Sequence, residues 1–195
     1  MRSLTFSVRG VSPLLMHSDA GIDPLSATAK QIRSFTKKRV KTDEDVATIA
    51  YLEWKAGIYF DPSVGVYVPA QNIHASIAEA ARSTKSGKKA KSAVFVSGLN
   101  GEENIPLQYE GPTDLQGLWD GGFYDARSVR IGTSRVMRYR PIFRDWGLSF
   151  RVVFSPEILS EDEVKSMVEF AGDFCGLCDY RPRFGRFEIS SVKES

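Results

Sequence analysis

The sequence predicts an α+β fold of the ferredoxin-like or RRM-like type, with a βαββαβ core. Three observations carry this prediction: a period-two strand pattern near residue 1, a capped helix near residue 160, and strand and helix patterns between them in the order of a split βαβ unit. The 195 residues, 42% of them apolar, are enough to bury a core without a metal or a disulfide. We expect one domain over residues 1–195, with insertions at about 20–56 and 84–125.

The first half of the chain is expected to supply a core strand, a core helix and a helical insertion. Residues 2–10 place Leu4, Phe6 and Val8 on one face and polar residues on the other, which predicts a half-buried strand. Helical patterns over 25–39 and 43–55 predict an inserted helical pair. A hairpin is expected over 57–69, followed by a helix from residue 70.

The second half is expected to complete the sheet. Residues 83–92 hold four lysines and no large apolar residue, which predicts a mobile loop. Strands are expected at 92–97 and 105–110, an irregular connection at 111–125, and a strand pair at 129–143 and 148–154. Ser160 and Glu163 predict a capping box for a helix that Gly176 ends, and a last strand follows at 186–192.

Composition excludes several classes of protein. No apolar run approaches the ~20 residues of a membrane span, and the first residues lack a signal-peptide pattern, so we expect a cytoplasmic protein. The only cysteines, Cys175 and Cys178, form one CxxC, which cannot make a zinc ribbon unless it is shared across a dimer. Because Cys175 falls at the end of a helical pattern and not at a helix start, where the dipole would lower a thiol pKa, we expect two reduced thiols. We also expect no metal and no cofactor.

The net charge of +2 is uninformative, but its distribution along the chain is not. Residues 30–41 contain six basic residues and no acid, and the lysine segment follows at 85–91. Between residues 127 and 151 there are seven arginines, no lysine and one aspartate. Planar guanidinium groups suit bidentate phosphate recognition. The candidate nucleic-acid-binding residues of these clusters are Lys37, Lys38, Arg39, Lys85, Lys88, Lys89, Arg130, Arg135, Arg138, Arg140 and Arg144.

Each basic cluster also has a plainer interpretation. The first fits a solvated helix face, and the lysine segment fits a role in solubility. In the arginine-rich strand, even positions hold Arg138, Arg140 and Arg144, whereas odd positions hold Met137, Tyr139 and Phe143 for packing. Ion-pair scaffolding is the alternative there, and the local shortage of carboxylates favours polyanion binding.

The loop after the last helix joins aromatic and basic residues. Arg181, Arg183 and Arg186 surround Gly185, with Tyr180 and Phe184 between them. Aromatic rings beside arginines can stack on the bases of a single strand. The alternative is that both rings are buried in the hydrophobic core.

Signals of catalysis are weak. The sequence has no GxSxG, HExxH or Walker pattern. His17, beside Ser18 and Asp19, is a weak general acid or base candidate, and His74 is a weaker one. We expect a binding protein rather than an enzyme.

Three segments together resemble a known family. They are Tyr67–Ile77, Gly176–Phe187, and the opening strand with Pro13–His17. They are similar to the strand-to-helix connection, glycine-containing loop and first strand of the RAMP superfamily, the RRM-like backbone subunits of CRISPR effector complexes. Ala70 and Cys178 stand where glycine is usual. The chain also resembles a compact form found in phage and prophage genomes.

The resemblance implies an RRM-like core, insertions that act as a thumb or finger, RNA or single-stranded DNA as ligand, and lateral self-assembly along it. The leading hypothesis is therefore a non-catalytic single-strand-binding protein, a homo-oligomer or a subunit of a nucleoprotein complex, with no membrane partner. One alternative is a metal-independent endoribonuclease of RAMP type that uses His17 or His74. The other is a phage protein-interaction module that mimics a CRISPR subunit.

Overall fold

A computed structural model of the chain describes residues 1–21, 23–83 and 86–194. The chain forms two compact units. Unit 1 comprises Met1–Leu14, Phe60–Glu110 and Phe143–Ser195, and unit 2 comprises Leu15–Tyr59 and Gly111–Ile142. The expected single domain with insertions stays a prediction. In the described part of the chain, no helix has both the length and the apolar character to cross a membrane.

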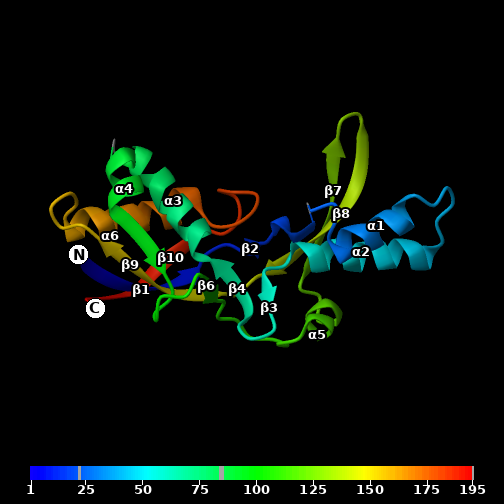
Figure 1. Cartoon of the computed structure of the whole chain (residues 1–195), viewed down its shortest axis with the longest axis horizontal. Coiled ribbons are helices and arrows are strands. Elements are labelled where there is room, and N and C mark those ends of the chain that lie inside the picture. Colours follow the sequence, from blue (N-terminus) through cyan, green and yellow to red (C-terminus); the bar gives the residue numbers. More distant parts are fainter. Residues whose placement is uncertain (22, 84–85, 195) are drawn as a thin grey trace. The chain divides into compact units, whose positions relative to one another are not determined.

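Unit 1 contains the predicted βαββαβ core. Its strands are β1 (Arg2–Gly10), β5 (Val94–Ser97), β9 (Gly147–Phe154) and β10 (Phe187–Glu194), which pair antiparallel in the order β10-β1-β9-β5. Helix α3 (Ala70–Ser83) lies between β1 and β5 in the chain, and α6 (Glu161–Phe170) lies between β9 and β10. Each helix thus joins two strands that a third strand separates, which confirms the α+β fold class. Both helices lie on the same side of the sheet (Figure 1).

The side chains that alternate along β1 and β9 form the core of unit 1. Leu4, Phe6 and Val8 of β1 are buried, and so is every second residue of β9 from Leu148 to Phe154. The rings of Phe6 and Phe150 stack with their centroids 5.7 Å apart. The buried face therefore follows from the period of two that the sequence shows.

The helical run that starts with α6 begins and ends where the sequence predicts. Ser160 and Glu163 make both hydrogen bonds of the capping box. The chain continues through one π-helical segment, η2 (Ala171–Cys175), and leaves it at Gly176 with a φ of 73°. A positive φ at this position favours glycine.

The prediction of a mobile loop over 83–92 is wrong for the described residues. They form helix α4 (Gly87–Ala93), whose buried side chains are Ala90 and Ala93. Alanine has the highest helix propensity and buries without large apolar groups, so the segment lacks the pattern of a packed helix. Lys85 lies outside the described residues. A small sheet in the order β3-β4-β6 completes unit 1, from β3 (Phe60–Asp61), β4 (Gly65–Pro69) and β6 (Asn104–Pro106).

Unit 2 contains the predicted helical pair. Helix α1 (Ala27–Thr36) ends three residues earlier than expected, and α2 (Asp43–Gly57) begins with a second capping box, from Thr42 and Asp45. Trp54 is fully buried, packs against the rings of Tyr51 and Trp119, and donates its Nε1–H to the Phe123 carbonyl at 2.9 Å.

The arrangement predicted for residues 111–143 is wrong. The segment expected to be irregular forms α5 (Leu115–Asp120) and the start of β7 (Tyr124–Ile131). Strand β8 (Ser134–Phe143) pairs with β7 in a hairpin and with β2 (Leu14–Leu15), whereas its expected partner β9 belongs to the sheet of unit 1. Met137, expected to pack, is 51% exposed, and Ser134 and Arg135 nearer the tip of the hairpin are exposed as well. A short 3₁₀ turn, η1 (Asp19–Gly21), precedes α1.

Candidate nucleic-acid interface

The β7–β8 hairpin places arginines opposite one another. In its register, Arg127 faces Arg138 and Arg130 faces Arg135. Like charges at directly opposite positions of an antiparallel pair destabilise it unless an anion lies near them. The hairpin therefore creates two sites of concentrated positive charge.

A carboxylate balances each arginine of the first pair. Arg127 donates from Nη2 to Asp125 Oδ1 at 2.8 Å, and Arg138 forms an ion pair with Glu53 of α2. These contacts support a structural role for this pair, in which ion pairs hold the fold together. The sequence disfavoured this alternative because few carboxylates lie nearby in the chain. The second carboxylate comes from a residue 85 positions away in the chain.

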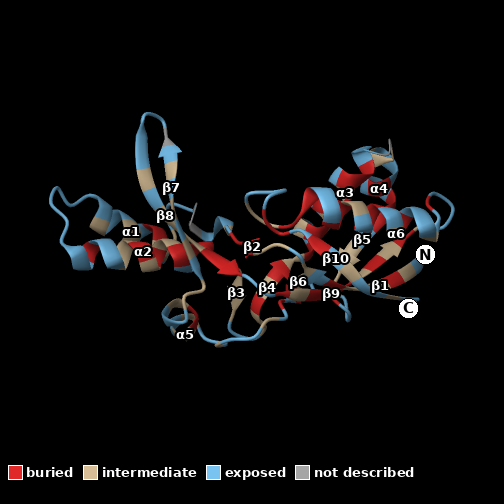
Figure 2. Ribbon diagram, turned by 180° about the vertical axis from the view of Figure 1, so that it is seen from behind, coloured by how far each residue is buried: buried red, intermediate tan, exposed pale blue. Residues whose placement is uncertain are grey.

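The second pair lies at the tip of the hairpin and has no such balance. Arg130 donates from Nε to the carbonyl of Gly132 at 3.0 Å. Within the described part of the chain, no carboxylate pairs with Arg130 or Arg135. Both residues are exposed, as is most of the tip (Figure 2). This pair is available to an external polyanion.

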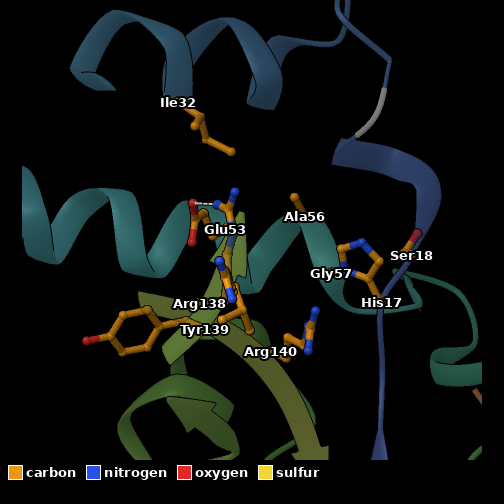
Figure 3. Close-up of a pocket in the computed structure, with 11 residues that line it drawn as sticks. His17, Ser18, Ile32, Glu53, Ala56, Gly57, Arg138, Tyr139 and Arg140 are labelled. Carbon is orange, nitrogen blue, oxygen red and sulfur yellow. Dashed lines mark hydrogen bonds and ion pairs between the residues drawn. The ribbon is translucent and has the colours of Figure 1, made fainter. Parts of the chain in front are cut away.

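A groove of about 480 Å³ in unit 2 collects further basic side chains. Arg138 and Arg140 of β8 line it together with His17 and Glu53 (Figure 3). Arg130 of β7 also lines it. Burial raises the pKa of the Glu53 carboxyl, and the Arg138 guanidinium opposes that rise. The arrangement suits an anionic ligand, because three guanidinium groups stand against one carboxylate.

The basic residues at the end of α1 differ in their surroundings. Lys37 is the C-cap of the helix and is exposed, as is Arg39. Lys38 is ion-paired to Asp45 at 2.6 Å, and this hydrogen bond holds the pKa of the Asp45 carboxyl below its usual range. The exposure of Lys37 and Arg39 also fits the plainer interpretation of a solvated helix face.

The three segments that resemble the RAMP superfamily meet in unit 1. Ser76 of α3 donates from Oγ to the Gly176 carbonyl at 2.8 Å. The N–H of Gly185 donates to the Pro13 carbonyl at 2.8 Å, and its own carbonyl accepts from Leu177 at 2.9 Å. These hydrogen bonds close residues 176–185 into a compact loop beside the end of β1.

The two aromatic residues of this loop have different environments. Tyr180 is 52% exposed and Phe184 is 8% exposed, with their ring centroids 5.9 Å apart. Phe184 is therefore part of the hydrophobic core, whereas Tyr180 presents its ring to solvent. Arg181 pairs with Glu79 at 3.1 Å, and Arg183 and Arg186 are exposed.

The remaining basic candidates are exposed in unit 1. Lys88 and Lys89 lie on α4, and Arg144 follows β8.

The two histidines line different cavities. His17 lies in the groove of unit 2, and His74 lines a cavity of about 350 Å³ in unit 1 with Gln71, Lys91 and Glu103.

Burial raises the pKa of the Cys175 and Cys178 thiols, that of Cys178 to about 12. Among residues 1–21, 23–83 and 86–194, no three potential ligands from His, Cys, Asp and Glu are grouped to hold a metal.

Sequence reasoning missed Glu53 and the walls of the groove. Ile32, Ala56 and Val129 line it beside the charged groups. One signal for Glu53 was available in the sequence: it is a carboxylate in the mostly apolar final turns of α2. It lies three and four residues before Ala56 and Gly57, so the three residues share one helix face.

Comparison with known proteins bears on the fold alone. No protein-family model and no curated protein matches the chain. A chain of the solved structure described as "Cryo-EM structure of the Type III-B Cmr-beta bound to cognate target RNA" is similar, with a TM-score of 0.50 and 12% sequence identity. The alignment covers 99% of this chain and 60% of that one, so this chain spans about three fifths of its length. With the strand order of unit 1, this similarity supports the RRM-like α+β fold.

Proposed function

We propose that this protein binds single-stranded nucleic acid, RNA or single-stranded DNA, without cleaving it, as a subunit of a nucleoprotein complex. The observation that carries the proposal is the opposed pair Arg130 and Arg135, which has no carboxylate partner in the part of the chain that the structure describes. Phosphates of a strand would relieve the repulsion between these two guanidinium groups. RNA is the first ligand to test, because the similar chain belongs to a complex bound to target RNA.

The other candidate residues have supporting roles in this proposal. In unit 2, Arg138 and Arg140 extend the basic surface, as do Lys37 and Arg39, which follow α1. In unit 1, Tyr180 provides the exposed ring for base stacking, which is worth about 1 to 3 kcal/mol per base. The remaining proposed phosphate contacts are Lys38, Lys88, Lys89, Arg144, Arg181, Arg183 and Arg186.

The test is a titration of labelled single strands of about 16 nucleotides at about 50 and 200 mM salt. Each phosphate contact on a single strand adds about 0.7 to the slope of log affinity against log salt. Arg130→Gln/Arg135→Gln should therefore weaken binding and reduce the slope by about 1.4.

The matched control is Arg2→Gln/Arg9→Gln, which removes the same charge from β1, where both arginines pair with glutamates. We expect the control to bind as the wild type does. Equal affinity and equal slope for both double variants would refute the proposal.

A second candidate function is metal-independent cleavage of RNA. The observation that favours it is the position of His17 in the same groove as Arg138 and Arg140, where a base would stand beside groups that stabilise a pentacoordinate phosphate. Cleavage of a structured RNA in the presence of a chelator, lost in His17→Ala and kept in His74→Ala, would support it. Intact RNA after prolonged incubation across a broad panel would exclude it.

A further inference from the structure

The groove of unit 2 has one closed end. The N–H of Met16 donates to the Pro141 carbonyl of β8 at 2.9 Å, and the N–H of Ser18 donates to the Gly57 carbonyl of α2 at 2.8 Å. Residues 16–18 thus join the two walls of the groove. A strand that enters between α2 and β8 would meet this bridge.

His17 lies at the centre of that bridge. It is exposed and lines the groove (Figure 3). The backbones of its neighbours, Met16 and Ser18, are hydrogen-bonded to β8 and α2. Arg138 and Arg140 of β8 line the same groove, with Arg138 beside Glu53. The Gly57 carbonyl at the C-terminus of α2 accepts from Ser18, so this acceptor is already paired where an anion would lie.

The charge at the closed end matches a phosphate monoester better than a diester. Three arginines and one carboxylate line the groove. A terminal phosphate carries about −1.5 to −2 at neutral pH, whereas an internal phosphodiester carries a single negative charge. Guanidinium groups also bind the additional oxygens of a monoester in bidentate fashion.

The remaining walls match the rest of a nucleotide. Ile32, Ala56 and Val129 are apolar, and Tyr139 adds an aromatic ring. The volume of about 480 Å³ falls in the range of about 300 to 1,000 Å³ typical of small-ligand pockets. A sugar and base can lie on these walls while the phosphate faces the arginines.

We propose that this groove binds the phosphorylated end of a nucleic acid strand, with the terminal phosphate against Arg138, Arg140 and His17. The inference rests on the proposed single-strand binding and adds that the protein distinguishes an end from the interior of a strand.

The experiment compares strands of one sequence that differ only at their ends: a 5′-phosphate, a 3′-phosphate, hydroxyls at both ends, and a covalent circle. We expect one phosphorylated strand to bind about tenfold tighter than the hydroxyl strand and the circle, the gain of one additional charge-assisted contact. The arm that gains affinity identifies the 5′ or the 3′ end.

Variants then assign the preference to the groove. His17→Ala and Arg140→Gln should bring the preference for the phosphorylated end below about twofold. Arg140→Lys keeps the charge without the planar fork, so it should fold normally and lose most of the preference. Arg135→Gln, outside the groove, should weaken all strands and keep the preference. A preference that survives in folded Arg140→Lys and His17→Ala would overturn the assignment.

The outcomes separate this inference from the proposed function. Equal binding of all four strands would overturn end recognition and leave single-strand binding intact. No binding of any strand would overturn both. Uridine monophosphate alone should bind at least about tenfold more weakly than the phosphorylated strand, and equal binding would show a site for free nucleotides instead.

Discussion

At the scale of single residues, the groove of unit 2 is governed by the ion pair between Glu53 and Arg138. The Glu53 carboxylate occupies a guanidinium that a phosphate would also use. Burial raises the pKa of this carboxyl, so the charged form is less stable in the groove than in water. A bound phosphate beside it would disfavour the charged form further, because both groups are anionic.

Glu53→Gln should therefore bind single strands more tightly, by about threefold to tenfold, since it removes a competing negative charge and keeps the shape of the side chain. Anisotropy titrations against Asp125→Asn, which breaks the pairing of Arg127 outside the groove, measure the effect. Lower affinity in Glu53→Gln would mean that the carboxylate holds Arg138 in its binding position.

The same substitution tests the pH dependence. A raised pKa means that Glu53 becomes protonated earlier than an ordinary glutamate as the pH falls from neutral, so wild-type affinity should rise on acidification. The part due to Glu53 is the difference between the wild type and Glu53→Gln, and an identical pH profile for the two proteins would contradict it.

The cysteines should be unreactive in the folded protein. Burial raises the pKa of Cys178 to about 12, so only about one thiol in ten thousand is ionised at pH 8. Ellman's reagent should react slowly with the native protein and rapidly with both thiols in guanidinium chloride. Fast reaction of a native thiol would contradict this prediction.

At the scale of elements, local patterns predict most of the fold and tertiary contacts decide the rest. Strand β1 and helix α6 carry their own signals, an alternation and a capping box. Helix α4 carries none, because its buried face consists of alanines. Strand β8 has the alternation of a strand, but nothing in that alternation selects β7 over β9 as its partner.

The candidate site divides in the same way. The arginines of the hairpin are visible as a segregated charge in the sequence. Their division into a neutralised pair and an open pair depends on Glu53 from α2 and on the hairpin register. The closed end of the groove depends on residues 16–18 reaching both α2 and β8, contacts that no local pattern encodes.

The loop over 176–185 provides a test at this scale. Gly185 has a φ of 73°, and a Cβ there would lie 2.1 Å from the Leu177 carbonyl oxygen. Gly185→Ala should lower the free energy of unfolding by more than about 2 kcal/mol, because backbone strain and a steric clash add. Gly65 has a φ of 84°, but a Cβ there would meet nothing within 4 Å. Gly65→Ala therefore measures the backbone strain alone, about 1 kcal/mol. Urea unfolding measures both, and equal losses would show that the loop relaxes freely.

At the scale of the whole molecule, a net charge of +2 conceals basic surfaces on both units. Unit 1 presents Arg183 and Arg186, and unit 2 presents the hairpin tip and the end of α1. A strand longer than the contact surface of one protomer would therefore have room for several. The family resemblance implies lateral assembly, and we propose end recognition by the groove. Together they predict how many protomers bind a strand of given length.

We expect a protomer at a phosphorylated end to be the first of a row. On strands of one, two and four site lengths, each about 4 to 16 nucleotides, the bound mass should rise in whole protomers with length. A terminal phosphate should lower the concentration that fills the row without changing the final number, because it strengthens only the first contact. Light scattering coupled to size exclusion measures both quantities. One protomer per strand at every length would refute assembly and leave end recognition, whereas length-dependent loading that ignores the phosphate would do the reverse.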